Sequence, residues 1–197
     1  NTAVLKLLSD TSVTISEGEM LELSNDKDPT INEDLYYDVI NGKTASLFSA
    51  ACQVGGMSAQ GSDKEVEYLK SFGANFGMSF QLIDDAIDYS SSNIVLGKNI
   101  GDDFKEGKVT LPIILAYLRS NKAEKDFWKK TIVHLKQEKD DFHHAINIIK
   151  KYDCIEDTID RARHFANVAI DSLGSFKDNN YKIGLINLIQ SSLNRLN

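Results

Sequence analysis

Three acidic residues, Asp84, Asp85 and Asp88, stand close together in the string Phe-Gln-x-x-Asp-Asp-x-x-Asp that begins at Phe80. On a helix with about 100° per residue, Gln81, Asp84 and Asp88 lie within roughly 60° of one another. Asp85 lies about 100° round from Asp84. Carboxylates this close repel one another unless they are fully solvated or bind a cation. Hard oxygen ligands without His or Cys nearby suit Mg²⁺, which completes its shell with water and phosphate oxygens. We therefore predict a magnesium site, with a solvated acidic face as the competing interpretation.

Three lysines offer the positive charge that a diphosphate group requires. Lys98 and Lys108 each follow a glycine in the segment after the acids, and Lys43 precedes Thr44 further upstream. Lysine ammonium groups act as point charges for phosphate, and glycine lets the backbone approach a ligand closely. Any one of these lysines taken singly is better explained as an ordinary surface charge. Together with the acids, the lysines favour a site for a diphosphate held through Mg²⁺.

Helices must position these residues, because apolar side chains recur at steps of three and four and only 2 prolines interrupt the 197 residues. An apolar stripe at 76, 80, 83 and 87 is expected to anchor the acid-bearing helix and leave its carboxylates on the other face. We expect an irregular stretch over residues 90–108. The expected helices cover approximately residues 4–23, 32–55, 62–89, 110–118, 126–136, 140–151, 153–173 and 177–196. With no repeats and no low-complexity linker, residues 1–197 are predicted to form a single all-α domain.

The composition excludes several classes of protein. The net charge of −7 and the scattered basic residues argue against a partner made of nucleic acid. No apolar stretch approaches the roughly 20 residues that span a bilayer, so we expect no membrane anchor. Two cysteines, Cys52 and Cys154, are too few for a disulfide scaffold and favour a reducing compartment. We therefore expect a cytoplasmic protein.

The string from Phe80 to Asp88 resembles the second aspartate-rich motif of trans-isoprenyl (polyprenyl) diphosphate synthases. Further segments resemble elements of the same family in the same order: Glu17-Gly18-Glu19, Lys43-Thr44-Ala45, Gly97-Lys98 and Lys108-Val109-Thr110-Leu111-Pro112. The amino-acid sequences of these segments are most similar to those of bacterial long-chain members such as octaprenyl diphosphate synthases. The resemblance covers roughly residues 4–120.

The resemblance implies an all-α bundle of the isoprenoid synthase type with a deep central cavity, assembled as a homodimer. It also implies chain elongation with Mg²⁺ as cofactor, in which an allylic diphosphate and isopentenyl diphosphate are the substrates. Metal and lysines draw the diphosphate away, the carbocation is attacked by isopentenyl diphosphate, and loss of a proton gives a longer trans-polyprenyl diphosphate.

Site roles follow from the resemblance residue by residue. Asp84 and Asp88 would ligate Mg²⁺, and Asp85 would do so directly or through water. Lys43 and Lys98 would hold the allylic diphosphate with Lys108 close by. Thr44 and Gln81 would lie beside the reacting carbons, and Glu22 would support the site from one turn after Glu19.

One departure affects the expected activity. The family carries a first aspartate-rich motif and an arginine pair ahead of the segment with which this chain begins, and neither occurs here. The N-terminal helices of the bundle would then be missing, and we expect residues 1–197 alone to be inactive or nearly so. The chain would be a truncated synthase, an incomplete chain, or one half of a two-chain enzyme.

Two further interpretations remain. The first is a non-catalytic helical subunit, or half-enzyme, of a heteromeric prenyl synthase. The acids and lysines quoted above are all retained, which favours descent from a working active site. The second is a terpene cyclase, but the metal triad of Asn, Ser/Thr and Glu that such enzymes carry is not evident.

Overall fold

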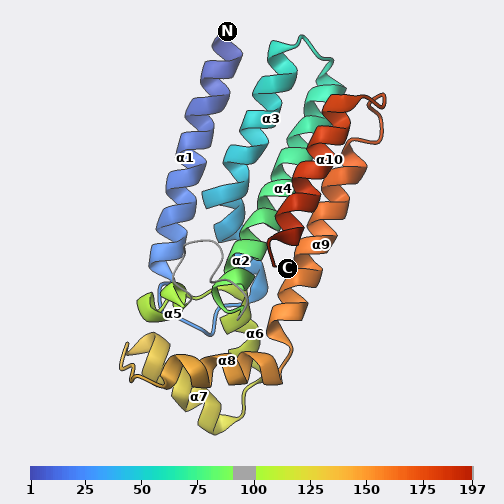
Figure 1. Cartoon of the computed structure of the whole chain (residues 1–197). Coiled ribbons are helices and arrows are strands. Elements are labelled where there is room, and N and C mark those ends of the chain that lie inside the picture. The colour runs from blue at the N-terminus through green and yellow to red at the C-terminus, as the bar shows by residue number, and fades with distance from the viewer. Residues whose placement is uncertain (91–100, 197) are drawn as a thin grey trace.

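A group of long helices standing side by side dominates the molecule, and shorter helices lie across one end of it (Figure 1). This computed structural model describes residues 1–90 and 101–196. The long helices are α1 (Thr2–Ser24), α3 (Ser46–Ser58), α4 (Asp63–Asp88), α9 (Cys154–Ser172) and α10 (Asn180–Leu193). The shorter ones are α2 (Glu33–Ile40), α5 (Asp102–Glu106), α6 (Leu111–Arg119), α7 (Lys122–Trp128) and α8 (Asp141–Lys151). Since the described residues contain no strand, the predicted all-α class is confirmed.

Capping side chains explain where several helices begin. Ser62 and Glu65 form a reciprocal capping box at the start of α4, close to the predicted boundary. Asn121 and Glu124 form another, so α7 begins at Lys122, four residues before the predicted position. The Asn179 side chain accepts from two backbone N–H groups, and the last helix therefore starts at Asn180 rather than near 177.

The second predicted helix, 32–55, differs from expectation in its middle. A wide π-helical turn, η1 (Asn41–Ala45), joins α2 to α3, and the run ends at Ser58 rather than near Gly55. Another such turn, η3 (Lys129–Val133), follows α7, and a 3₁₀ turn, η4 (Asn194–Leu196), follows α10. Within the predicted irregular stretch the structure contains the short helix α5; residues 91–100 lie outside the described residues.

Glycines let α1 and α4 approach the turn η1 closely. A Cβ at Gly18 of α1 would lie 2.5 Å from the backbone nitrogen of Lys43 in η1. A Cβ at Gly77 of α4 would lie 2.6 Å from the Cα of Ala45. Both distances are shorter than a real Cβ contact allows, so glycine is required at each crossing. The turn that carries Lys43 and Thr44 is thereby held against α1 on one side and α4 on the other.

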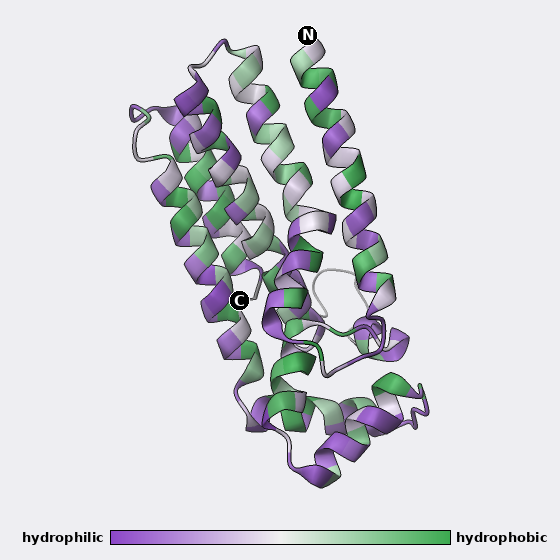
Figure 2. Ribbon diagram, turned by 180° about the vertical axis from the view of Figure 1, so that it is seen from behind, coloured by the Kyte–Doolittle hydropathy of each residue, from purple (hydrophilic) through white to green (hydrophobic). Residues whose placement is uncertain are grey.

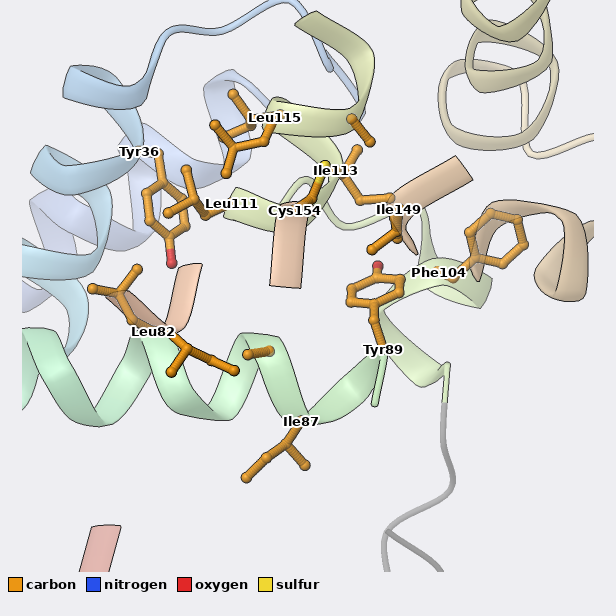
Figure 3. Packing of buried hydrophobic residues seen from close by; sticks show 14 of the residues in the cluster. Tyr36, Leu82, Ile87, Tyr89, Phe104, Leu111, Ile113, Leu115, Ile149 and Cys154 are labelled. Atoms are coloured by element: carbon orange, nitrogen blue, oxygen red, sulfur yellow. The ribbon is translucent and has the colours of Figure 1, made fainter. Parts of the chain in front are cut away.

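The core is continuous from α4 to the crossing helices. Leu82, Ile83 and Ala86 of α4 pack with apolar residues of α2, α6 and α8, including Leu111 and Ile149. Figure 3 shows part of this cluster above α4. A second cluster, around Phe72 and Phe76, joins α4 to α9 and α10. Over residues 1–90 and 101–196, no helix is both long enough and apolar enough to cross a membrane.

Candidate active site

A pocket of about 420 Å³ opens between the end of α1, α2 with η1, α4, and residues 103–110. Its polar lining combines side chains from all of these elements: Glu22, Asn25, Asp26, Tyr36, Lys43, Thr44, Gln81, Asp85, Asp103, Glu106, Lys108 and Thr110. Leu23, Ile31, Val39, Ile40 and Val109 supply apolar walls. Among these residues five are carboxylates and two are lysines. The described lining is therefore net acidic, which disfavours a bare diphosphate and favours one accompanied by cations.

Lys43 lies in the π-helical turn η1 and faces two acids of α1. Its Nζ donates to Glu22 Oε2 and lies 3.1 Å from Glu19 Oε2. Burial alone would lower the pKa of Lys43, but the hydrogen bonds to Glu22 and Glu19 outweigh it, so the pKa lies above its ordinary value. The lysine is charged and already oriented into the pocket. π-Helical turns occur frequently at functional sites.

A chain of hydrogen bonds joins Thr44 to Tyr36 across α4. Thr44 Oγ1 donates to Gln81 Oε1 at 3.0 Å, and Gln81 Nε2 donates to Asp85 Oδ1 at 2.8 Å. Tyr36 Oη donates to the other carboxylate oxygen of Asp85 at 2.6 Å. Sequence reasoning placed Thr44, Gln81 and Asp85 at one site, and the structure brings these three together.

Asp85 is almost completely buried, with 2% of its surface exposed. Burial raises the pKa of its carboxyl to about 6, although Lys108 and the hydrogen bonds from Tyr36 and Gln81 act in the opposite direction. The expectation that all three acids project from an uncovered face of α4 is therefore wrong for Asp85. Helix α4 is packed on several sides, and α2 covers the side on which Asp85 lies.

Asp84 and Asp88 are half-buried and have separate partners. Asp84 Oδ1 accepts from Arg195 Nη2 at 3.1 Å. Asp88 Oδ2 accepts from the backbone N–H of Asp103 at 3.1 Å, at the start of α5. Burial and the nearby charge of Asp103 raise the pKa of Asp88 to about 6. Each acid is thus held in place by a different element.

The donor set fits magnesium only as part of a shell. Over the described ranges 1–90 and 101–196, no three His, Cys, Asp or Glu side chains are grouped closely enough to hold a metal alone. Mg²⁺ usually takes only one or two carboxylates and completes its octahedron with water and substrate phosphates. Asp84 and Asp88, one helical turn apart, would supply two such carboxylates. Neither is among the described residues that line the pocket, whereas Asp85 is.

Lys108 lines the same pocket from the segment that follows α5. Its Nζ lies 3.3 Å from Asp103 Oδ1, and burial, which lowers its pKa, is outweighed by the charges of Asp85 and Asp103, which raise it. Lys98, the remaining predicted phosphate ligand, lies outside the described residues.

Sequence reasoning missed two residues of the pocket. Tyr36 lies on α2, and no local spacing indicates its hydrogen bond to Asp85, which is 49 residues away along the chain. Asp103 lies in the glycine-containing segment before Lys108, and nothing in its spacing indicates that its backbone N–H donates to Asp88.

Comparison with known proteins identifies the family. The family model described as Polyprenyl synthetase matches residues 1–149. The chain belongs to the polyprenyl synthetase family. Among curated members, the chain is 32% identical over 192 residues to octaprenyl diphosphate synthase of Haemophilus influenzae and 35% identical over 192 residues to that of Escherichia coli. These alignments cover 98% of the chain and 58% and 59% of the relatives. The predicted family and its long-chain bacterial character are confirmed.

Solved structures of polyprenyl synthetases share the same fold. A decaprenyl diphosphate synthase from Rhodobacter capsulatus superposes with a TM-score of 0.94 at 36% identity. A polyprenyl synthase from Caulobacter crescentus CB15, described as complexed with calcium and isoprenyl diphosphate, superposes with 0.95 at 37%. Both matches cover 100% of this chain, but only 61% and 60% of those proteins. The chain thus spans about three fifths of the length of these relatives.

Proposed function

We propose that this chain belongs to a Mg²⁺-dependent prenyltransferase that condenses an allylic diphosphate with isopentenyl diphosphate to a longer trans-polyprenyl diphosphate. The observation that carries the proposal is the pocket itself. Lys43 and Lys108 line it from different elements, together with Thr44, Gln81 and Asp85. The related structure that holds calcium and isoprenyl diphosphate supports this assignment.

The predicted site residues take the following roles in this reaction. Lys43 and Lys108, with Lys98, bind the allylic diphosphate and neutralise the charge that grows on it as it departs. Asp84 and Asp88 would hold Mg²⁺, and Asp85 would reach it directly or through water. The chemistry that the metal supplies when bound is further neutralisation of the departing diphosphate. Thr44 and Gln81 direct oxygen atoms toward the carbon that becomes positively charged.

We further propose that the protein is a homodimer located in the cytoplasm, a location that its two free cysteines support. A further segment or a second chain would complete the site, since family members carry another aspartate-rich motif.

Elongation of farnesyl diphosphate by labelled isopentenyl diphosphate tests the proposed function. The protein is assayed with any sequence that its gene encodes on either side of residues 1–197. We expect product only with Mg²⁺, and a loss of activity on the order of 100-fold in Asp84→Asn and Asp88→Asn. Asp63→Asn, which removes an exposed carboxylate from the first turn of the same helix, is the matched control and should retain activity.

Other outcomes decide between the alternatives. Robust elongation by residues 1–197 alone would show that the reaction does not need the first aspartate-rich motif. A folded protein that elongates nothing by itself, yet activates a second chain, would instead establish the non-catalytic subunit.

A further inference from the structure

We propose that Tyr36 and Asp85 are positioning residues that fix the side-chain amide of Gln81, so that its oxygen faces Thr44 and the pocket. This inference rests on the proposed function, because it explains how the oxygens beside the reacting carbon are held. It gives Asp85 a role that metal coordination does not require, and it adds Tyr36 to the machinery of the site.

The donor and acceptor in each of these hydrogen bonds follow from the chemistry of the side chains. An ionised carboxylate only accepts hydrogen bonds, so the group of Gln81 that faces Asp85 must be its NH₂. The amide oxygen then faces Thr44, whose hydroxyl proton is directed to Gln81 Oε1 at 3.0 Å. The remaining lone pairs of the Thr44 oxygen stay available to the pocket. Both Gln81 and Thr44 therefore present negative rather than positive partial charge.

Tyr36 completes this arrangement from a separate element. Its hydroxyl lies 2.6 Å from Asp85 Oδ2, while Gln81 Nε2 takes Oδ1. Each oxygen of the carboxylate thus has its own donor, and the plane of the group is fixed. Tyr36 is 3% exposed and Asp85 2%, so water does not compete freely for either bond. Figure 3 shows the Tyr36 ring beside the core, with its hydroxyl oxygen directed toward α4.

The same helix provides a matched control. Tyr37 also donates its hydroxyl to an acid, Glu33, but it lies outside the pocket and packs against Phe165 of α9. Tyr37→Phe therefore removes a hydroxyl group from the same helix and leaves the hydrogen bonds that link Tyr36, Asp85 and Gln81 in place. A merely structural effect of losing a tyrosine hydroxyl from α2 would appear in both variants.

The first test examines the amide directly. In protein labelled with ¹⁵N in its glutamine side chains, the two protons of Gln81 Nε2 should be widely separated in shift and slow to exchange with solvent. Tyr36→Phe and Asp85→Asn should shift these signals and speed their exchange at least about threefold, and Tyr37→Phe should leave them unchanged. The amide of an asparagine at position 85 can donate a hydrogen bond, which permits the side-chain amide of Gln81 to flip and exchange its oxygen and nitrogen positions. Equal responses to Tyr36→Phe and Tyr37→Phe would overturn the inference.

The second test separates positioning from metal binding. In the elongation assay, Tyr36→Phe should lower kcat about tenfold and Asp85→Asn about 100-fold, since small misplacements cost this much. The KM values and the Mg²⁺ concentration for half-maximal rate should stay within about twofold in Tyr36→Phe. A large rise in that Mg²⁺ requirement in both variants would contradict a positioning role. Absence of elongation by the unmodified protein counts against the proposed function, whereas the amide signals judge the inference independently.

Discussion

Lys43 lies where two glutamates and a diphosphate would compete for one ammonium group. Glu22 and Glu19 already pair with it, and Glu22 also lines the pocket. Their carboxylates hold the lysine in position, but they also add negative charge to a cavity that must admit an anion. The pairing is partly exposed, so its strength is modest and a phosphate group can displace it.

Glu22→Gln is therefore expected to tighten the binding of Mg²⁺-pyrophosphate about two- to fivefold, as expected for an interaction of roughly 0.5–1 kcal/mol. One negative charge leaves the pocket, while Glu19 still orients Lys43. Isothermal titration calorimetry measures the affinity. Glu17→Gln changes the net charge equally on an exposed part of α1 and should have no effect. Weaker binding in Glu22→Gln would mean that orientation of Lys43 outweighs repulsion.

Only the placement of Gln81, Asp84 and Asp88 on one side of a helix followed from sequence spacing. The grouping of Lys43 and Thr44 with them was predicted from the family resemblance of their motifs. The burial of Asp85 was not, since a helical projection shows which residues share a face but not which neighbouring helix covers it. Tyr36 was missed for the same reason. Its partner Asp85 is 49 residues away along the chain, and only tertiary packing brings them together.

At the scale of elements, the π-helical turn η1 is held between two glycine crossings. Gly18 admits the backbone of Gly42 and Lys43 on one side, and Gly77 admits Ala45 on the other. The helices themselves were predictable from apolar periodicity and capping residues. The wide turn was not, because it arises from contacts with α1 and α4 rather than from local propensity.

Gly18→Ala tests this close approach. The new methyl group would overlap the backbone of Lys43, so α1 must move away, and we expect destabilisation by about 1–3 kcal/mol. Binding of Mg²⁺-pyrophosphate should weaken as well, since Glu22 and Lys43 separate. Urea unfolding followed by circular dichroism measures the stability.

Gly55→Ala is the control for that substitution. A Cβ at Gly55 of α3 meets nothing within 4 Å, so alanine should stabilise the helix by about 0.5–1 kcal/mol. The same loss of stability in both variants would show that the crossing at Gly18 is not the cause.

A two-pronged ion pair joins α2 to α9 and gives stability a pH dependence. Arg161 donates to both carboxylate oxygens of Glu33, and this hydrogen bonding lowers the pKa of Glu33 despite the opposing effect of burial. A lowered pKa means that the stabilisation is complete above the ordinary value of 4.5 and is lost as the pH falls through the folded value. Glu33→Gln should cost about 1 kcal/mol at pH 7 because the pair is partly exposed.

Urea unfolding of Glu33→Gln and of the unmodified protein from pH 7 down to pH 3 measures this dependence. The difference between them should shrink as the pH falls below 4.5 and through the lowered pKa of Glu33 in the folded protein, where the carboxyl becomes protonated. A difference that stays constant over this range would rule out ionisation of Glu33 as its source.

At the scale of the whole molecule, α1 exposes apolar side chains on the side turned away from the bundle. Gly18 and Thr11 face the bundle and are buried. Leu5, Val13 and Met20, which lie on the opposite side of a helical projection, are 68%, 55% and 68% exposed. Figure 2 shows hydrophobic residues alternating with hydrophilic ones along the whole of this helix. Exposed apolar side chains that share one side of a helix are typical of an interaction surface, so we expect the outer side of α1 to pack against a second copy in the proposed homodimer.

Leu5→Lys combined with Met20→Lys should therefore weaken self-association by about tenfold or more, measured by sedimentation equilibrium. Two charges in an apolar contact leave unpaired ammonium groups. Leu118→Lys, at a leucine of α6 that is 70% exposed, is the matched control and should associate as the unmodified protein does. Association that is indifferent to all three substitutions would place the contact elsewhere.

The wide turn at Asn41–Ala45 also suggests how the pocket can change among related proteins in evolution. A π-helical turn holds one residue more than regular α geometry needs, so loss of a single codon there would convert it to an ordinary turn. The ammonium and hydroxyl carried by this turn would rotate by about 100° relative to one flanking helix, while the apolar layers beyond remained in register. Alignment gaps at this point therefore signal a change in what the pocket accepts rather than a change of architecture.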